Sequence, residues 1–379
     1  MLIGSAVFIL SYSTLSIFID FKHKILVAFY SLGIGVQYFY NYVARALQKN
    51  TLFVMSGCIN SIITIIINVV LIAGFNLGIE SLYISSLVGI LVQVVIIEYN
   101  VRLLKVKIEG LKKGTIIALL KFSTPLSIST ISNWLLSGLT TVVISFYIGT
   151  HENGLYSVAN RFSAVLILLV GVFQFAWNEL AYMMSNNKSK NEYYQKGISE
   201  ILKISLLGCS IFLLCIKIVF PYFIAQQYHE AITIIPIVLL GTSINAYSGF
   251  LGTIFLANKH SNKLFISTIV GAAANVIGLL VFSPIYGLMG ALISLCVAQF
   301  ISAFSRLYML KKSESIRPHP KVYIFLLVPL ISLVTFYLIS NTYILLTAVF
   351  AFLVIAFFTT KPFLIGVLDI FKKRFVKSN

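Results

Sequence analysis

Long apolar runs separated by short polar segments fill almost the whole chain. Each run is about 18–30 residues long, which is the length that a membrane-spanning helix needs. Strands of a membrane β-barrel alternate in hydrophobicity and run for only about 10 residues, so this pattern favours helices. It predicts an all-α polytopic membrane protein with about 12 transmembrane helices, near residues 2–19, 25–43, 52–74, 79–100, 118–147, 154–183, 198–225, 231–256, 263–284, 286–310, 321–339 and 342–360.

The composition agrees with a membrane protein and gives no sign of a cofactor. Hydrophobic residues make up 59% and charged residues 10% of the 379 residues, whereas soluble domains are roughly 45–50% apolar and about 25% charged. The four cysteines lie in apolar runs without a Cys-x-x-Cys pair, so we expect neither a disulfide framework nor a zinc site. The Gly-rich phosphate loop of ATPases is absent from the sequence, which argues against direct use of ATP.

The basic residues predict how the chain lies in the membrane. Of the 28 lysines and arginines, 24 lie in or beside the loops after even-numbered runs and in the tail, and Arg306 is counted among them. Only Lys22 and Lys24 lie in loops of the opposite side. The positive-inside rule therefore predicts that both termini are cytoplasmic. This topology accounts for the net charge of +17, so no nucleic-acid partner is expected.

An internal repeat predicts two related lobes. Residues 50–82 and 262–292 share an Asn, a Leu-Phe pair, a mid-span Asn and a glycine turn, at an offset of about 210 residues. Repeats in the same orientation imply lobes related by an axis along the membrane normal, with a central cavity between them. We expect a four-helix lobe over 1–115, a six-helix lobe over 116–312, and two extra helices with a basic cytoplasmic tail over 313–379. The first lobe is two helices short of the repeat, which suggests a truncated chain or a misplaced start codon.

The centre of the chain resembles a known family. Lys121 to Leu126 (KFSTPL), Asn133 to Leu136 (NWLL), Gly154 to Ala159 (GLYSVA) and Ala176–Trp177 resemble the signature of bacterial polysaccharide and O-antigen repeat-unit flippases. These belong to the multidrug/oligosaccharidyl-lipid/polysaccharide exporter superfamily. The resemblance implies a multi-pass protein of the bacterial cytoplasmic (inner) membrane. Three features depart from the family: its first two helices are absent, Thr140 stands where an Asp is frequent, and Glu179 where a Pro is common.

The resemblance also implies an activity and partners. The chain would flip an undecaprenyl-diphosphate-linked oligosaccharide from the cytoplasmic to the outer leaflet, by alternating access between two six-helix lobes. Its partners would be this lipid-linked oligosaccharide, membrane lipids, polysaccharide assembly proteins and a possible coupling cation. The alternatives are a cation-coupled multidrug extruder of the same superfamily, a membrane enzyme of polysaccharide assembly, and an inactive remnant. An enzyme is not expected, because His151, His229 and Asp20 form no recognisable cluster.

Charged residues inside the apolar runs are the first candidates for function. Each costs roughly 2.5–3.5 kcal/mol at a helix centre, so such residues usually face a cavity. Arg161 is the candidate for binding a lipid diphosphate, because its planar guanidinium can hold phosphate with two hydrogen bonds. Its alternatives are an interfacial position or a pair with Glu152. Glu179 and Lys217 are candidates for coupling or gating, and both also suit the membrane interface.

Amides and aromatic rings inside the runs are candidates for sugar binding. Asn133, Asn178 and Asn245 offer the donors and acceptors that a sugar path needs. Hydrogen bonds between helices explain such amides as well, at about 0.6 kcal/mol each. Trp134 and Trp177 are predicted either to stack on sugar rings or to anchor the chain at the membrane interface.

Overall fold

The computed structural model describes residues 23–103, 113–185, 187, 189–339 and 341–377. The chain divides into two compact units, Met1–Lys112 and Lys113–Asn379. The described residues form helices and contain no strand. Among them, nine helical segments are long and apolar enough to cross a membrane. The predicted all-α membrane fold is therefore confirmed, while the predicted run at 2–19 lies outside the described residues.

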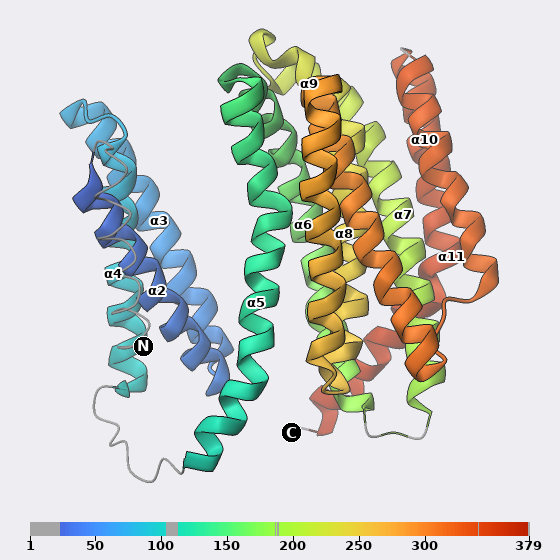
Figure 1. Ribbon diagram of the computed structural model, residues 1–379, viewed down its shortest axis with the longest axis horizontal. Helices are drawn as coiled ribbons and strands as arrows, with labels where there is room; N and C mark the ends of the chain where they lie inside the picture. The colour runs from blue at the N-terminus through green and yellow to red at the C-terminus, as the bar shows by residue number, and fades with distance from the viewer. Residues whose placement is uncertain (1–22, 104–112, 186, 188, 340, 378–379) are drawn as a thin grey trace. The chain divides into compact units, whose positions relative to one another are not determined.

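In unit 1 the described residues form three helices, drawn in blue and cyan in Figure 1. They are α2 (Lys24–Ala46), α3 (Asn50–Phe75) and α4 (Glu80–Val101). Their bounds match the predicted runs within a few residues. Both α2 and α3 pack on α4, so α4 is the helix that holds the described part of this unit together.

A buried amide network joins these three helices. Gln93 of α4 is only 2% exposed. Its Nε2 donates to Oδ1 of Asn41 at 3.0 Å, while its Oε1 accepts from Nε2 of Gln37 at 2.7 Å and from Nδ2 of Asn60 at 3.0 Å. Polar side chains that are satisfied in this way fix how membrane helices pack against one another.

Unit 2 is built from seven α-helices and short linking turns. They are α5 (Lys113–Val143), α6 (Thr150–Met184), α7 (Lys190–Phe223), α8 (Ile235–Ala257), α9 (Ser261–Glu314), α10 (Leu327–Leu338) and α11 (Thr342–Lys377). Helix α5 packs on α9, α6 packs on α8, and both α10 and α11 pack on α7. The predicted separate segment 313–379 thus begins inside α9 and continues in helices that belong to the same compact unit.

Two glycines make the sharp turns of unit 2. Helix α5 ends in a π-helical turn, Ile144–Ile148, and Gly149 then adopts φ 151° before α6 starts. Helix α9 contains the two predicted runs 263–284 and 286–310, and it has a non-helical break at Gly287, φ 53°, at the start of the second run. Residues with a Cβ rarely adopt such positive φ angles, so glycine fits both positions.

The internal repeat extends to the helix bounds. Lys24 and Ala46 bound α2, and Ile235 and Ala257, each 211 residues later, bound α8. Helix α3 starts at Asn50, and α9 starts 211 residues later, at Ser261. The predicted offset therefore holds for two successive helices in each unit.

The turns between these helices also match in backbone structure. Gln48 has φ 58°, and Lys259, 211 residues later, has φ 60°. Three backbone hydrogen bonds close each turn at matching positions: Leu47 N to Val43 O, Gln48 N to Arg45 O and Lys49 N to Ala44 O in the first turn, and Asn258 N to Ile254 O, Lys259 N to Leu256 O and His260 N to Phe255 O in the second.

Candidate functional site

Helix α6 presents its two charged candidates on one face. Arg161 and Glu179 are both exposed and lie 18 residues apart, so about five helical turns separate them and they point the same way, roughly 27 Å apart. That distance is close to the hydrocarbon thickness of a bilayer, about 30 Å. The exposed side chains between them, Val165, Leu168 and Phe175, are apolar. The charges therefore mark the two ends of an apolar stripe on an unbroken helix.

Arg161 does not pair with Glu152. The carboxylate of Glu152 lies instead over Gly149, where a Cβ would overlap its Oε2. Among the described residues, no hydrogen bond or ion pair engages the Arg161 guanidinium. The alternative that paired Arg161 with Glu152 is therefore wrong, and the guanidinium keeps its donors for a ligand or for solvent.

A polar cluster lies where α6 meets α8. Oδ1 of Asn178 accepts from Oγ1 of Thr253 at 2.7 Å and from Nε2 of Gln174 at 2.8 Å. Nε2 of Gln174 also donates to Oγ1 of Thr253 at 3.0 Å. These bonds fit the expected role of such amides in joining helices. Within the part of the chain that the structure describes, the Asn178 Nδ2 donor and the Gln174 Oε1 acceptor make no hydrogen bond, and both side chains are only partly buried.

The remaining sugar-binding candidates do not form one cluster with Asn178. Asn245 is exposed on α8, one turn before Gly249, which lies beside the Gln174 side chain. Trp134 of α5 is 60% exposed, and its indole covers Gly138 one turn later in the same helix. Asn133 lies in α5, and its side chain is outside the described residues.

Trp177 is a core residue, which corrects the prediction that it binds sugar or anchors an interface. It is only 3% exposed, and its Nε1 donates to the carbonyl of Phe250 at 3.0 Å. Its indole stacks on Tyr193 with an interplanar angle of 7°. A ring whose donor is used and whose surface is covered has neither a face nor a donor to offer a sugar in this structure.

Lys217 serves the packing of α10 on α7. Its ammonium donates to the carbonyl of Phe336 and, at 2.6 Å, to that of Ile339, both at the C-terminal end of α10. It also lies 5.2 Å from the ring centroid of Phe336. Carbonyls at the end of a helix lack partners within that helix and favour a cation. These contacts account for Lys217 without the coupling or gating role predicted from the sequence.

The sequence prediction misplaced Arg306. The count of basic residues places Arg306 with the cytoplasmic loops, but it lies within α9 and is 5% exposed. Its guanidinium donates to Oγ of Ser267 at 3.1 Å, to the carbonyl of Ser248 at 2.6 Å and to Oγ1 of Thr268 at 3.0 Å. Arg306 shares the inward face of α9 with the buried residues Gln299, Ser302 and Leu310. The helical spacing of the polar residues Gln299, Ser302 and Arg306 was the signal available from the sequence.

Comparison with known proteins gives a family match over part of the chain and identifies the fold. Residues 1–177 match the family model of polysaccharide biosynthesis proteins. The lipid II flippase MurJ in an inward closed conformation matches with a TM-score of 0.68 and 20% identity, over 97% of this chain and 82% of that one. An outward-facing multidrug resistance transporter of the MATE family, from the MOP superfamily, matches with a TM-score of 0.64 and 14% identity. The match covers 86% of this chain and 76% of that one.

A third solved structure agrees with these two. The Vibrio cholerae MATE transporter VcmN matches with a TM-score of 0.60 at 16% identity, over 82% of this chain and 77% of that one. No curated protein sequence matches the chain significantly. The chain thus matches the polysaccharide biosynthesis protein family over residues 1–177, and it has the fold of the lipid II flippase and MATE transporter structures.

Proposed function

We propose that the chain is a transporter that flips an undecaprenyl-diphosphate-linked oligosaccharide from the cytoplasmic to the outer leaflet of the bacterial inner membrane. The observation that carries the proposal is Arg161: an exposed arginine in a membrane helix, engaged by no described carboxylate. The polysaccharide biosynthesis family match and the fold shared with a lipid II flippase support the same class of cargo.

The charge of the cargo explains the need for such an arginine. A diphosphate is costly to move through hydrocarbon, so a flippase must offer it a compensating charge. A guanidinium presents a planar fork of donors that matches phosphate oxygens, which an ammonium does not. Arg161 would hold the diphosphate at one end of the apolar stripe of α6.

Polar and aromatic side chains of α5, α6 and α8 would contact the sugars. Asn178 and Gln174 keep one donor and one acceptor without described partners, and Asn245 and Trp134 are exposed. Amides and an aromatic face are the groups that bind sugar hydroxyls and rings. Their partial exposure and modest number suit transient contact, which a transported cargo requires.

The negative charge of the cargo suggests what drives its transport. A negative-inside membrane potential favours outward movement of an anion by about 2.3 kcal/mol per charge per 100 mV. Electrical driving and antiport of a cation both remain compatible with this. Glu179, at the far end of the α6 stripe, is the carboxylate that a coupling cation would use.

The test is surface polysaccharide in cells that depend on this chain. Arg161→Ala should abolish the polymer at an unchanged membrane level of protein, whereas Arg161→Lys should retain part of it. Leu168→Ala, on the same face and 73% exposed in the parent, is the matched control and should leave the polymer unchanged. Normal polymer from Arg161→Ala would overturn the assigned role of Arg161, and drug efflux with unaltered polymer would favour an extruder instead.

A further inference from the structure

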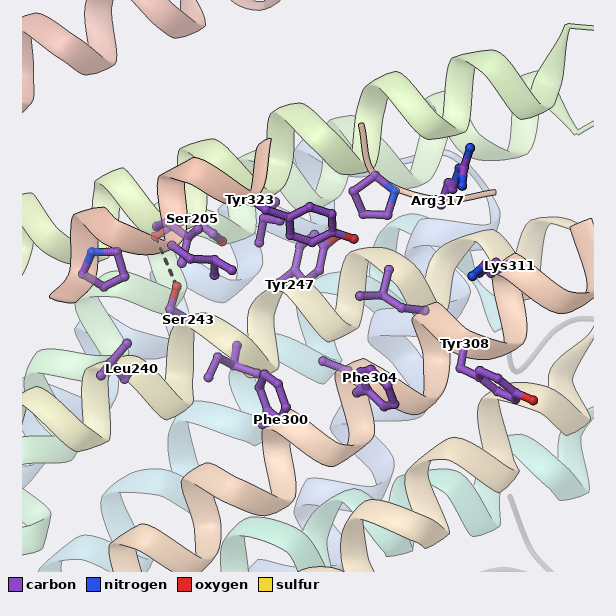
Figure 2. Close-up of a pocket in the computed structure, with 18 residues that line it drawn as sticks. Ser205, Leu240, Ser243, Tyr247, Phe300, Phe304, Tyr308, Lys311, Arg317 and Tyr323 are labelled. Carbon is purple, nitrogen blue, oxygen red and sulfur yellow. Dashed lines mark hydrogen bonds between the residues drawn. The ribbon is translucent and has the colours of Figure 1, made fainter. Parts of the chain in front are cut away.

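Unit 2 contains a long apolar groove that the proposed transport does not use. It has a volume of about 530 Å³ and lies between α7, α8, α9 and the segment that leads into α10. Figure 2 shows Phe300, Phe304 and Tyr308 in a row along one side. These aromatic residues are all more than half exposed, so the groove is open along this side.

The groove is charged at one end only. Figure 2 shows Lys311 and Arg317 together at this end, with Ser205 and Ser243 at the other. Within the described residues, no carboxylate lines the groove. Glu314 follows Lys311 by three positions, but it is occupied elsewhere: its Oε2 accepts from Nδ2 of Asn258 at 2.6 Å, and its Oε1 lies 3.2 Å from Nδ1 of His260. The end of the groove therefore suits an anion.

The segment that carries Arg317 is held in place. Nε2 of Gln195 donates to the carbonyl of Ser315 at 3.0 Å, and the backbone N–H of His319 donates to Oγ of Ser199 at 2.8 Å. Ile316, between them, is fully buried. Arg317 is thus presented from a loop that is fixed on both sides to α7.

A buried hydroxyl in the groove lacks a partner. Tyr247 of α8 lines the groove and is 5% exposed, and its hydroxyl makes no hydrogen bond among the described residues. Figure 2 shows its ring beside Tyr323, between the basic end and the serine end. A buried hydroxyl without a partner is destabilising. A ligand oxygen at this depth would remove that cost.

We infer that the groove binds one anionic phospholipid, with its phosphate at Lys311 and Arg317, one acyl chain along Phe304 and Phe300, and an ester oxygen accepting from Tyr247. Phe300 and Lys311 lie 11 residues apart on α9, which is about 16 Å. Half of a bilayer's hydrocarbon is about 15 Å. The groove therefore spans one leaflet, the length of one acyl chain with its headgroup at the basic end.

This lipid is distinct from the proposed cargo. A polyprenyl chain is far longer than one leaflet, and Arg161 lies on α6, which does not line the groove. The lipid would contact α7, α8, α9 and the start of α10, and so hold α10 on the unit. The inference does not depend on the flippase function.

The experiment measures lipid retained by the purified full chain in detergent, by native mass spectrometry, with phosphatidylglycerol and phosphatidylcholine of the same acyl chains as probes. We expect one phosphatidylglycerol, preferred over phosphatidylcholine. The double variant Lys311→Gln/Arg317→Gln should bind it roughly 10- to 30-fold more weakly, since each basic residue near the surface contributes about 1 kcal/mol. Tyr247→Phe should weaken the binding of both lipids several-fold.

The control variant Lys312→Gln/Arg102→Gln removes the same charges outside the groove and should bind as the parent does. Equal retention of both lipids, or no change in the Lys311/Arg317 variant, would overturn the inference. Retention of undecaprenyl phosphate in place of phosphatidylglycerol would also overturn it and assign the groove to cargo. Arg161→Ala should retain phosphatidylglycerol normally, so failure of the proposed transport and failure of this inference are distinguishable.

Discussion

The indole of Trp177 lies directly against the backbone of Gly197. A methyl group at Gly197 would overlap Cζ3 and Cη2 of the indole, so α6 and α7 approach each other here as closely as a glycine permits. The same indole donates to the carbonyl of Phe250 on α8. Three helices of unit 2 therefore meet at Trp177, two residues before Glu179. The position of the exposed face of α6 depends on this contact.

Gly197→Ala should destabilise unit 2. The added methyl group forces the Trp177 indole or α7 to move, and overpacking of this kind costs about 1–3 kcal/mol. Gly208→Ala, in the same helix, meets no neighbouring atom within 4 Å and should raise stability by up to about 1 kcal/mol, because alanine favours helix. Thermal unfolding in detergent measures both. A Gly197→Ala protein that melts like the parent would show that the close contact is absent in solution.

Gln93→Leu should destabilise the packing of the helices in unit 1. The substitution removes three hydrogen bonds to Gln37, Asn41 and Asn60, each worth about 0.6 kcal/mol on average in membrane helices. We expect a loss of about 2 kcal/mol and faster proteolysis of the N-terminal unit. Asn100→Leu, on the same helix, removes only a bond to the carbonyl of Ile96 in its own helix and is the control. Equal effects of the two substitutions would argue against a network that joins the helices.

The helices themselves could be predicted from the sequence, and the reason is physical. Lipid requires about 20 consecutive apolar residues, and this requirement is visible as hydropathy alone. The repeat was also visible, because helices that pack alike keep small and polar residues at matching positions. The break at Gly287, by contrast, follows from a backbone angle that hydropathy does not encode.

The roles of individual polar residues could not be predicted in the same way. Arg161 and Arg306 both lie on apolar helices, yet one is exposed and the other is buried among serine and threonine side chains. In the same way, Trp177 is buried, whereas Trp134 is exposed. Which neighbour faces a given residue is decided by tertiary packing, so a sequence pattern can propose the candidates but cannot separate a site residue from a core residue.

Lys217→Met should weaken the attachment of α10 without changing transport by the folded protein. The substitution leaves the carbonyls of Phe336 and Ile339 without their ammonium donor, and a buried acceptor left without a donor costs about 1–3 kcal/mol. Limited proteolysis between α10 and α11 should become faster. Lys196→Met, at an exposed position of the same helix, is the control. Loss of transport with unchanged proteolysis and melting would instead support the coupling role.

Arg306 should tolerate methionine better than lysine. Its guanidinium is buried, and the acceptors that it contacts are neutral: the hydroxyls of Ser267 and Thr268 and the carbonyl of Ser248. Both hydroxyls also donate to the carbonyl of Leu264, so they remain bonded once the arginine is removed. Methionine fills similar space without a charge, and replacing buried charges by apolar groups is often neutral or stabilising.

Arg306→Lys keeps the positive charge but loses the planar set of guanidinium donors. One ammonium cannot reach the three acceptors that lie around a planar guanidinium, so Arg306→Lys leaves a buried charge that is poorly solvated by the protein. We expect Arg306→Met to melt within a few degrees of the parent and Arg306→Lys clearly below it, with Lys312→Met as an exposed control on the same helix. The opposite order would mean that the positive charge itself, rather than its burial, is what α9 requires at this position, and would make Arg306 a second candidate for holding an anion.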